Sequence, residues 1–227
     1  MQTKPDSPVH PIPFHRQPFD AVLLCDGSPP PRTMLEDATN ACRMFIAADG
    51  GGNRAREMKL MPDAVIGDLD SFTPETGDTM EVIHDPCQET NDLEKALQYA
   101  HQQNAQSVLV FGATGLRFDH ALKNLSVMAR FHSRFKQLVF RDAHSDLFLI
   151  DSPYETDIEP GLDVSLFPLS GRVEEITTGG LQYPLRGEPL ENGVRDGSSN
   201  RTTGSHLSIH YRKGDLLLII NHKPATF

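Results

Sequence analysis

Short apolar segments alternate with amphipathic stretches up to about residue 150 of this 227-residue chain. The amphipathic stretches are clearest at 92–104 and 119–132, where Leu122, Leu125 and Met128 recur at helical spacing. Strands that are apolar throughout and separated by helices form βαβ units, whose parallel sheet is covered on both faces. We therefore predict a three-layer, Rossmann-like α/β domain with strands at 21–25, 44–48, 64–66, 81–83, 108–112, 138–140 and 147–150.

The pattern changes after Asp151, where helical spacing disappears and a turn-rich connector, 152–161, begins. The apolar segments that follow are typical of an antiparallel β-sandwich or roll, with strands at 162–167, 173–183, 206–211 and 216–220. Residues 212–215 separate the last two of these segments. Because they contain Gly214, which tolerates a positive φ, we predict that they form a hairpin loop.

These patterns divide the chain near residues 150–155. Residues 1–18 contain five prolines and no apolar run, so they predict a flexible leader and no secretion signal. We expect an α/β domain at 19–152 and a β domain at 153–227.

The charge and the cysteine content exclude several classes of protein. The formal net charge is −10, with 21 basic and 31 acidic side chains. A broad basic surface for nucleic acid is therefore not expected, and any phosphate ligand would arrive with a divalent cation. No apolar run approaches the 18 or so residues of a membrane span. The three cysteines are an odd number without CxxC spacing, which favours a reducing cytoplasm over a disulfide framework.

A glycine-rich turn follows the second predicted strand. Residues Gly50 to Ala55 fit the pattern G-x-G-x-x-A, which suggests a dinucleotide-binding turn at a helix N-terminus. The carboxylate of Asp49 precedes it directly and would repel a pyrophosphate unless a cation or a substrate group offset the charge. The alternative is a tight turn in which Asp49 caps the following helix.

The third predicted strand ends in two acids, Asp68 and Asp70. In extended backbone, residues two apart point to the same side, so these carboxylates would share one space. At a separation of ~4 Å they would repel by roughly 4 kcal/mol at an effective dielectric near 20, which favours a bound cation. Oxygen ligands of this kind suit Mg²⁺. A solvated turn with an Asp N-cap is the alternative.

Two further strand-to-helix segments carry polar residues. At 88–95, Asn91 is a suitable N-cap, Glu94 completes a capping-box-like pattern, and Asp92 in the first turn complements the helix dipole. At 112–120, two glycines free the backbone for close approach to a ligand, and Arg117 is suited to bidentate contact with phosphate. A P-loop is not present in the sequence.

Taken in order, the motifs ADGGGNR (48–54), PDAVIGDLDS (62–71), QETNDLEKAL (88–97), GATGLRFDH (112–120), GLQYPL (180–185) and GSSN (197–200) resemble thiamine pyrophosphokinases. The resemblance covers the chain from about residue 20. It implies an ATP-binding α/β domain, a β domain that helps to bind thiamine, and a homodimer with active sites between subunits. The implied reaction transfers diphosphate from ATP to the hydroxyl of thiamine, giving thiamine diphosphate and AMP.

The resemblance also implies roles for individual residues. It gives catalytic roles to Asp49, Asp68, Asp70 and Asp92, of which the last three would hold Mg²⁺. Thiamine would be contacted by Asp49, Ser71, Ser199 and Asn200. ATP would be contacted by Gly50, Asn53, Arg54, Gln88, Asn91, Lys95, Thr114, Gly115, Arg117, Asp119 and His120.

This chain departs from the family's usual pattern in one of these motifs. The family frequently has Thr-Asp where this chain has Asn91-Asp92, so an amide replaces a hydroxyl beside the acid. The chain also lacks Trp, so an aromatic contact to the acceptor would come from Phe, Tyr or His.

Three other functions remain open on the sequence alone. The glycine turn is compatible with an NAD-type oxidoreductase, although Asp49 and the Asp68/Asp70 pair count against it. The same fold is compatible with a nucleotide-binding regulator without turnover. A diphosphokinase acting on another heterocyclic alcohol, such as a hydroxymethylpterin, would share the ATP half of the site. For thiamine diphosphorylation, Asp49 or Asp70 would orient the attacking hydroxyl.

Overall fold

The computed structural model describes residues 18–222, so nearly all of the predicted leader, 1–18, lies outside the described residues. Within the described range the chain forms two compact units, residues 18–149 and 150–222. No helix within 18–222 combines the length and the apolar character needed to cross a membrane.

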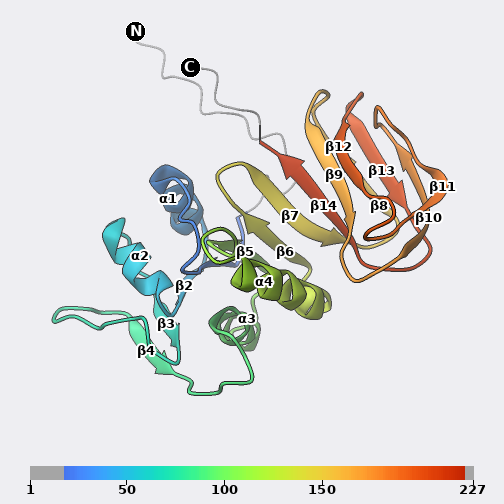
Figure 1. Ribbon diagram of the computed structural model, residues 1–227. Helices are drawn as coiled ribbons and strands as arrows, with labels where there is room; N and C mark the ends of the chain where they lie inside the picture. The colour runs from blue at the N-terminus through green and yellow to red at the C-terminus, as the bar shows by residue number, and fades with distance from the viewer. Residues whose placement is uncertain (1–17, 223–227) are drawn as a thin grey trace, which may run out of the picture. The chain divides into compact units, whose positions relative to one another are not determined.

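The first unit is a mostly parallel sheet with helices between its strands (Figure 1). Its strand order is β7-β6-β5-β1-β2-β3-β4, and only β7 runs antiparallel to its neighbour. The strands are β1 (Ala21–Leu24), β2 (Met44–Ala48), β3 (Ala64–Gly67), β4 (Glu81–His84), β5 (Ser107–Phe111), β6 (Gln137–Arg141) and β7 (Ser145–Ile150). The helices are α1 (Arg32–Ala41), α2 (Gly51–Glu57), α3 (Asp92–Gln102) and α4 (Phe118–Phe131), followed by a 3₁₀ turn at His132–Arg134.

Burial along the central strands explains this architecture. Every residue of β1 and β3 is buried, so side chains on both faces of the sheet are covered, as the apolar runs predict. Helices α3 and α4 contribute one apolar face each, through residues such as Leu97 and Met128. The α/β class and the mostly parallel sheet are confirmed.

The second unit is antiparallel β structure. One sheet has the order β11-β10-β13-β8, and β12, β9 and β14 pair side by side in a second group. The strands are β8 (Tyr154–Asp157), β9 (Asp163–Pro168), β10 (Val173–Gly179), β11 (Arg186–Leu190), β12 (Gly197–Arg201), β13 (His206–His210) and β14 (Leu216–Asn221). Buried and less buried residues alternate along β9 and β13, so these strands bury one face.

The predicted hairpin at 212–215 is wrong. Strand β13 pairs with β10 and β8, whereas β14 pairs with β9, so the two strands belong to different groups. Gly214 does have the expected positive φ, 116°. A Cβ at this position would meet the backbone oxygen of Arg172 at 2.7 Å, so the glycine lets the connection pass close to the start of β10. Sequence spacing alone does not distinguish a tight hairpin from a crossing between sheets.

A buried ion pair joins β6 to β7 at the antiparallel edge of the first unit. Arg141 donates through Nε and a terminal nitrogen to the two carboxylate oxygens of Asp146, at 2.6 and 2.7 Å. The Asp146 side chain is fully buried and that of Arg141 is 8% exposed. Removing one member of such a pair leaves the other charge buried and uncompensated.

We therefore expect Asp146→Asn to lower the free energy of unfolding by about 3 kcal/mol, measured by urea denaturation. The control is Glu36→Gln, which removes an exposed i,i+4 pair with Arg32 on α1 and should cost about 0.5 kcal/mol or less. Equal losses in the two variants would show that burial does not decide the contribution of the Arg141–Asp146 pair.

Candidate functional site

A cavity of about 360 Å³ opens at the carboxyl ends of β1, β2, β3 and β5 in the first unit. Open parallel sheets bind ligands at this edge, because the loops that follow neighbouring strands converge there. The cavity is lined by Cys25, Asp26, Gly27, Ala48, Asp49, Gly50, Asp68, Asp70, Ser71, Asn91, Asp92, Leu93, Gly112, Ala113, Gly115, Leu116, Arg117, His120 and Asn124.

Asp49 follows β2 and is 3% exposed, with a positive φ of 42°. Its carboxylate accepts hydrogen bonds from the backbone N–H groups of Ser71 and Phe72, at 3.1 and 3.2 Å. Burial raises the pKa of Asp49 and outweighs these hydrogen bonds, which lower it. The nearby charge of Asp92 raises the pKa further. Its side chain therefore anchors the loop after β3 instead of capping α2.

The glycine turn owes its composition to close packing. A Cβ on Gly51 would lie 2.1 Å from the carbonyl oxygen of Leu24, and one on Gly50 would lie 2.8 Å from the Asp26 carboxylate. These glycines let α2 begin against the end of β1. A Cβ on Gly52, the second glycine of the G-x-G-x-x-A pattern, would lie 2.7 Å from the ring of Phe72, so packing accounts for the match without a dinucleotide.

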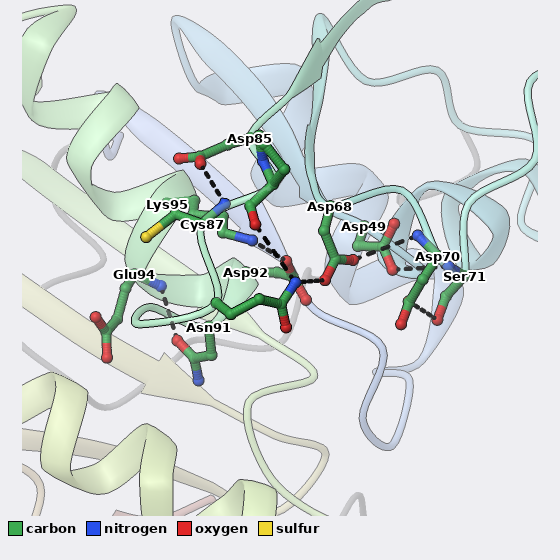
Figure 2. A network of polar contacts seen from close by, with 12 residues as sticks. Asp49, Asp68, Asp70, Ser71, Asp85, Cys87, Asn91, Asp92, Glu94 and Lys95 are labelled. Atoms are coloured by element: carbon green, nitrogen blue, oxygen red, sulfur yellow. Dashed lines mark hydrogen bonds and ion pairs between the residues drawn. The ribbon is translucent and has the colours of Figure 1, made fainter.

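Asp68 and Asp70 follow β3, and both line the cavity. One oxygen from each of Asp49, Asp68 and Asp70 lies within 4.8 Å of the other two, so the predicted convergence of Asp68 and Asp70 is confirmed (Figure 2). The prediction that extended backbone brings them together is wrong, because Leu69 has a φ of 60° and the segment turns there. Asp49 is the third member of this group.

Hydrogen bonds fix the orientation of the two acids. Asp68 accepts from Gln88 Nε2 at 3.1 Å and from the backbone N–H of Asp70 at 3.3 Å. The Gln88 contact is the largest of the effects that lower the pKa of Asp68. Asp70 accepts from the hydroxyl of Ser71 at 2.8 Å. Asp68 is therefore ionised at neutral pH and available to a cation.

The N-terminus of α3 brings a fourth acid to the cavity. Asn91 caps the helix by accepting from the backbone N–H of Glu94 at 3.0 Å, as predicted. Asp92 lines the cavity and lies 3.3 Å from Nζ of Lys95, whose side chain is 2% exposed. Asp92 is outside the group within 4.8 Å, which contains Asp49 in its place.

The loop after β5 closes the other side of the cavity. Gly112 and Gly115 have φ values of 66° and 80°, which other residues rarely adopt. The carbonyl oxygens of Gly112 and Thr114 accept from the backbone N–H groups of Gly27 and Ser28, both at 2.9 Å. The loop is therefore held against the segment that follows β1, although Thr114 itself does not line the cavity.

Arg117 and His120 line the cavity, but the Arg117 guanidinium is bonded to its neighbour Asp119. The two contacts are 3.1 Å from Nε and 2.5 Å from a terminal nitrogen. Arg117 lowers the pKa of Asp119 to about 2. Both side chains are about two-thirds exposed, so this pair contributes little to stability and does not prevent Arg117 from binding another anion.

Several residues expected at the ATP site do not line the cavity. Asn53 donates to the backbone oxygen of Ser71 at 2.8 Å, and Arg54 pairs with Asp26 at 2.9 Å. Gln88, Lys95, Thr114 and Asp119 are likewise outside the lining set, and the first two act through Asp68 and Asp92.

Two polar residues of the lining, Asp26 and Asn124, were not expected from the sequence, nor was the neighbouring Gly27. Asp26-Gly27 directly follows β1, so the rule that parallel strand ends converge would have found it. Asn124 lies in the middle of α4, where no local pattern marks it.

The two residues expected from the second unit are Ser199 and Asn200. Asn200 is 6% exposed, and its amide exchanges two hydrogen bonds with the backbone of Tyr183, at 2.8 and 3.0 Å. Its oxygen also accepts from the backbone N–H of Arg201 at 2.8 Å. Ser199 is exposed with a φ of 57°. Asn200 therefore fixes the local backbone, including that of the 63%-exposed Tyr183.

Comparisons with known proteins agree on one family. The family described as "Thiamin pyrophosphokinase, catalytic domain" matches residues 35–140, and "Thiamin pyrophosphokinase, vitamin B1 binding domain" matches residues 155–216. The chain is 26% identical over 203 residues to the thiamine pyrophosphokinase of Bacillus subtilis, covering 83% of this chain and 94% of the relative. It is 28% identical over 192 residues to thiamine pyrophosphokinase 1 of Oryza sativa subsp. japonica, covering 70% and 71%.

Among solved structures, the chain resembles a thiamin pyrophosphokinase from Candida albicans with a TM-score of 0.81. That match covers 91% of this chain and 92% of the solved chain at 19% identity, so it supports the fold.

The close approach of Asp49 and Asp92 to β3 generates a prediction. A Cβ on Gly67 would lie 2.6 Å from Cβ of Asp49 and 3.1 Å from Oδ1 of Asp92. We expect Gly67→Ala to lower the free energy of unfolding by about 1–3 kcal/mol, because the added methyl group would clash with Asp49 and crowd Asp92. Thermal unfolding measures this. Gly204→Ala is the control, since nothing lies within 4 Å of that Cβ, and an equal loss there would contradict the packing argument.

Proposed function

The chain belongs to the thiamin pyrophosphokinase family and is a thiamine diphosphokinase, and we propose that the cavity at the strand ends of its first unit is the active site. The observation that carries this proposal is the convergence of Asp49, Asp68 and Asp70 within 4.8 Å at the edge where parallel sheets bind ligands. ATP supplies the diphosphate, and thiamine supplies the hydroxyl that accepts it.

The acids fit a hard divalent cation. Three carboxylates from two strand ends offer oxygens within 4.8 Å, and Asp92 lines the same cavity from α3. Mg²⁺ prefers such oxygen ligands and takes one or two carboxylates together with substrate phosphates. We assign the metal site to Asp68, Asp70 and Asp92, with Asp49 as a buried acid beside Asp68 and Asp70. When bound, the cation would neutralise charge on the phosphate oxygens.

In the reaction, the hydroxyl oxygen of thiamine bonds to the β-phosphorus of ATP as the bond to the bridging oxygen of AMP breaks. Either Asp49 or Asp70 would orient the hydroxyl and receive its single proton. Both line the cavity, and Ser71 holds Asp70 through its own hydroxyl. Positioning of the two reactants supplies much of the catalysis in such transfers.

The phosphates need donors that are free to reach them. We propose that the backbone of 112–115 and the side chain of Arg117 provide these contacts, with Lys95 adding a positive charge behind Asp92. Arg117 is two-thirds exposed, so exchange of Asp119 for a phosphate group has a small cost in free energy. Residues Gly50, Asn53, Arg54, Gln88, Asn91, Thr114, Asp119 and His120 complete the proposed ATP site, some of them by holding their neighbours.

We propose that the second unit contributes to thiamine binding through Ser199 and through Asn200, which fixes the backbone of Tyr183. Ser71 would contribute from the first unit. The match of residues 155–216 to the vitamin B1 binding domain supports this assignment. We also propose a cytoplasmic location, which is consistent with the free thiols of Cys25, Cys42 and Cys87.

Asp68→Asn and Asp70→Asn should each lower the rate of AMP formation by about 10²–10³-fold or more, because each loses a charge that stabilises the transition state. The assay contains ATP, Mg²⁺ and thiamine, and separates AMP from ADP. Asp37→Asn removes an exposed acid of α1 and serves as the control with unchanged rate.

Wild-type rates in both Asp68→Asn and Asp70→Asn would remove these residues from the site. ADP as the sole adenine product of the unmodified protein would contradict diphosphate transfer. AMP formation that requires a hydroxymethylpterin in place of thiamine would change the acceptor.

We further propose that the protein is a homodimer whose active sites lie between subunits. Sedimentation equilibrium should then give twice the chain mass of 25.2 kDa. A single 25.2 kDa species that makes thiamine diphosphate at full rate would contradict this arrangement.

A further inference from the structure

Asn124 is a buried amide in the cavity wall, 7% exposed, on the inner side of α4. Its Nδ2 donates to the backbone oxygen of Ala113 at 2.8 Å. Its Oδ1 accepts from Nδ2 of Asn91 at 2.8 Å, and Oδ1 of Asn91 accepts from the backbone N–H of Glu94 at 3.0 Å. Two side-chain amides therefore connect the loop after β5 to the N-terminus of α3.

The direction of this chain of hydrogen bonds is fixed at both ends. The Ala113 carbonyl can only accept, so the amide nitrogen of Asn124 must face it. That leaves its oxygen toward Asn91, whose nitrogen must then face Asn124. The oxygen of Asn91 is thereby turned to the Glu94 N–H, which can only donate. Neither amide can be reversed without leaving a buried polar group unsatisfied.

The two ends of this chain of hydrogen bonds lie in different parts of the proposed ATP site. Ala113 belongs to the 112–115 segment, whose backbone lines the cavity. Asn91 directly precedes Asp92 and lies one helical turn before Lys95, whose Nζ is 3.3 Å from Asp92. A shift of α4 or of Asn124 therefore reaches the phosphate loop and the acid of α3 together.

We infer that Asn124 is a positioning residue that, through Asn91, sets the phosphate loop at 112–115 against the Asp92-bearing end of α3. This inference rests on the proposed function of the cavity. Asn124 acts on the bound nucleotide through Ala113 and Asn91. Its loss should therefore lower kcat/KM for ATP while leaving the KM for thiamine unchanged.

Asparagine at position 91 is well suited to this role. An amide has its acceptor and its donor on different atoms, so Asn91 caps α3 and reaches Asn124 at the same time. A hydroxyl has a single oxygen. When that oxygen caps Glu94, it lies about the width of an amide group short of Asn124. Asn91→Thr therefore keeps a good cap while removing the link.

A second tie between α3 and α4 supplies the control. Glu94 is 1% exposed and pairs with two cations of α4, Lys123 at 2.8 Å and Arg130. This contact does not include Asn91 or Asn124. Lys123→Gln weakens the packing of the two helices, so it should lower the free energy of unfolding while leaving the kinetics unchanged.

The test is steady-state kinetics with ATP and thiamine varied in turn. Asn124→Ala should lower kcat/KM for ATP by about 10–100-fold, with the KM for thiamine unchanged. Asn91→Thr should lower kcat/KM for ATP by about 10-fold. If the two residues act in series, the double variant loses no more than Asn124→Ala alone.

Values of kcat/KM for ATP within about twofold of wild type in both single variants, or losses that multiply in the double variant, would overturn the inference. Should Asn124→Ala not fold, Asn124→Asp replaces it, because it keeps the oxygen toward Asn91 and opposes the Ala113 carbonyl. Wild type, the two single variants and the double variant are also unfolded in urea. In this double-mutant cycle the losses in free energy of unfolding should not be additive. Absence of AMP from wild type would refute the proposed function, whereas AMP with additive unfolding energies would refute the positioning role.

Discussion

Mutual repulsion among carboxylates is the constraint on which the rest of this structure depends. Oxygens of Asp49, Asp68 and Asp70 lie within 4.8 Å of one another, and like charges at that range separate unless the backbone prevents it. The N–H groups of Ser71 and Phe72 hold Asp49, and the absence of a side chain at Gly67 admits it beside β3. The fold thus keeps Asp68 and Asp70 close enough to bind the proposed cation together, with Asp49 beside them.

The parallel sheet makes this concentration of charge possible, because its strand ends meet at one edge. Apolar burial along β1 and β3 holds the strands in register, and their ends leave the polar loops at the cavity. Helix α3 adds Asp92 with Lys95 beside it, and the loop after β5 adds a backbone bent by Gly112 and Gly115. The buried residues of the strands therefore stabilise the sheet, whereas the segments that follow the strands supply the polar groups of the cavity.

Sequence reasoning succeeded where a residue's role follows from its immediate neighbours. The apolar runs predict the parallel strands, and Asn91 followed by Glu94 predicts the cap of α3. It failed where distant contacts decide, as for β14, which pairs with β9 and not with β13. Helix α1 has Leu35 as its only buried side chain and so gives little periodic signal, and β12 is polar. Asn124 gained its role only when the fold brought Ala113 and Asn91 to it.

The most direct test of the account is to locate the cation. Crystals grown with Mn²⁺ and a non-hydrolysable ATP analogue would show the metal by its anomalous scattering, and Mn²⁺ accepts the same oxygen ligands as Mg²⁺. The account predicts an anomalous peak within coordination distance of Asp68 and Asp70, with the analogue's phosphates completing the site. A peak elsewhere in the molecule, or phosphates bound in this cavity with no metal beside those carboxylates, would contradict it.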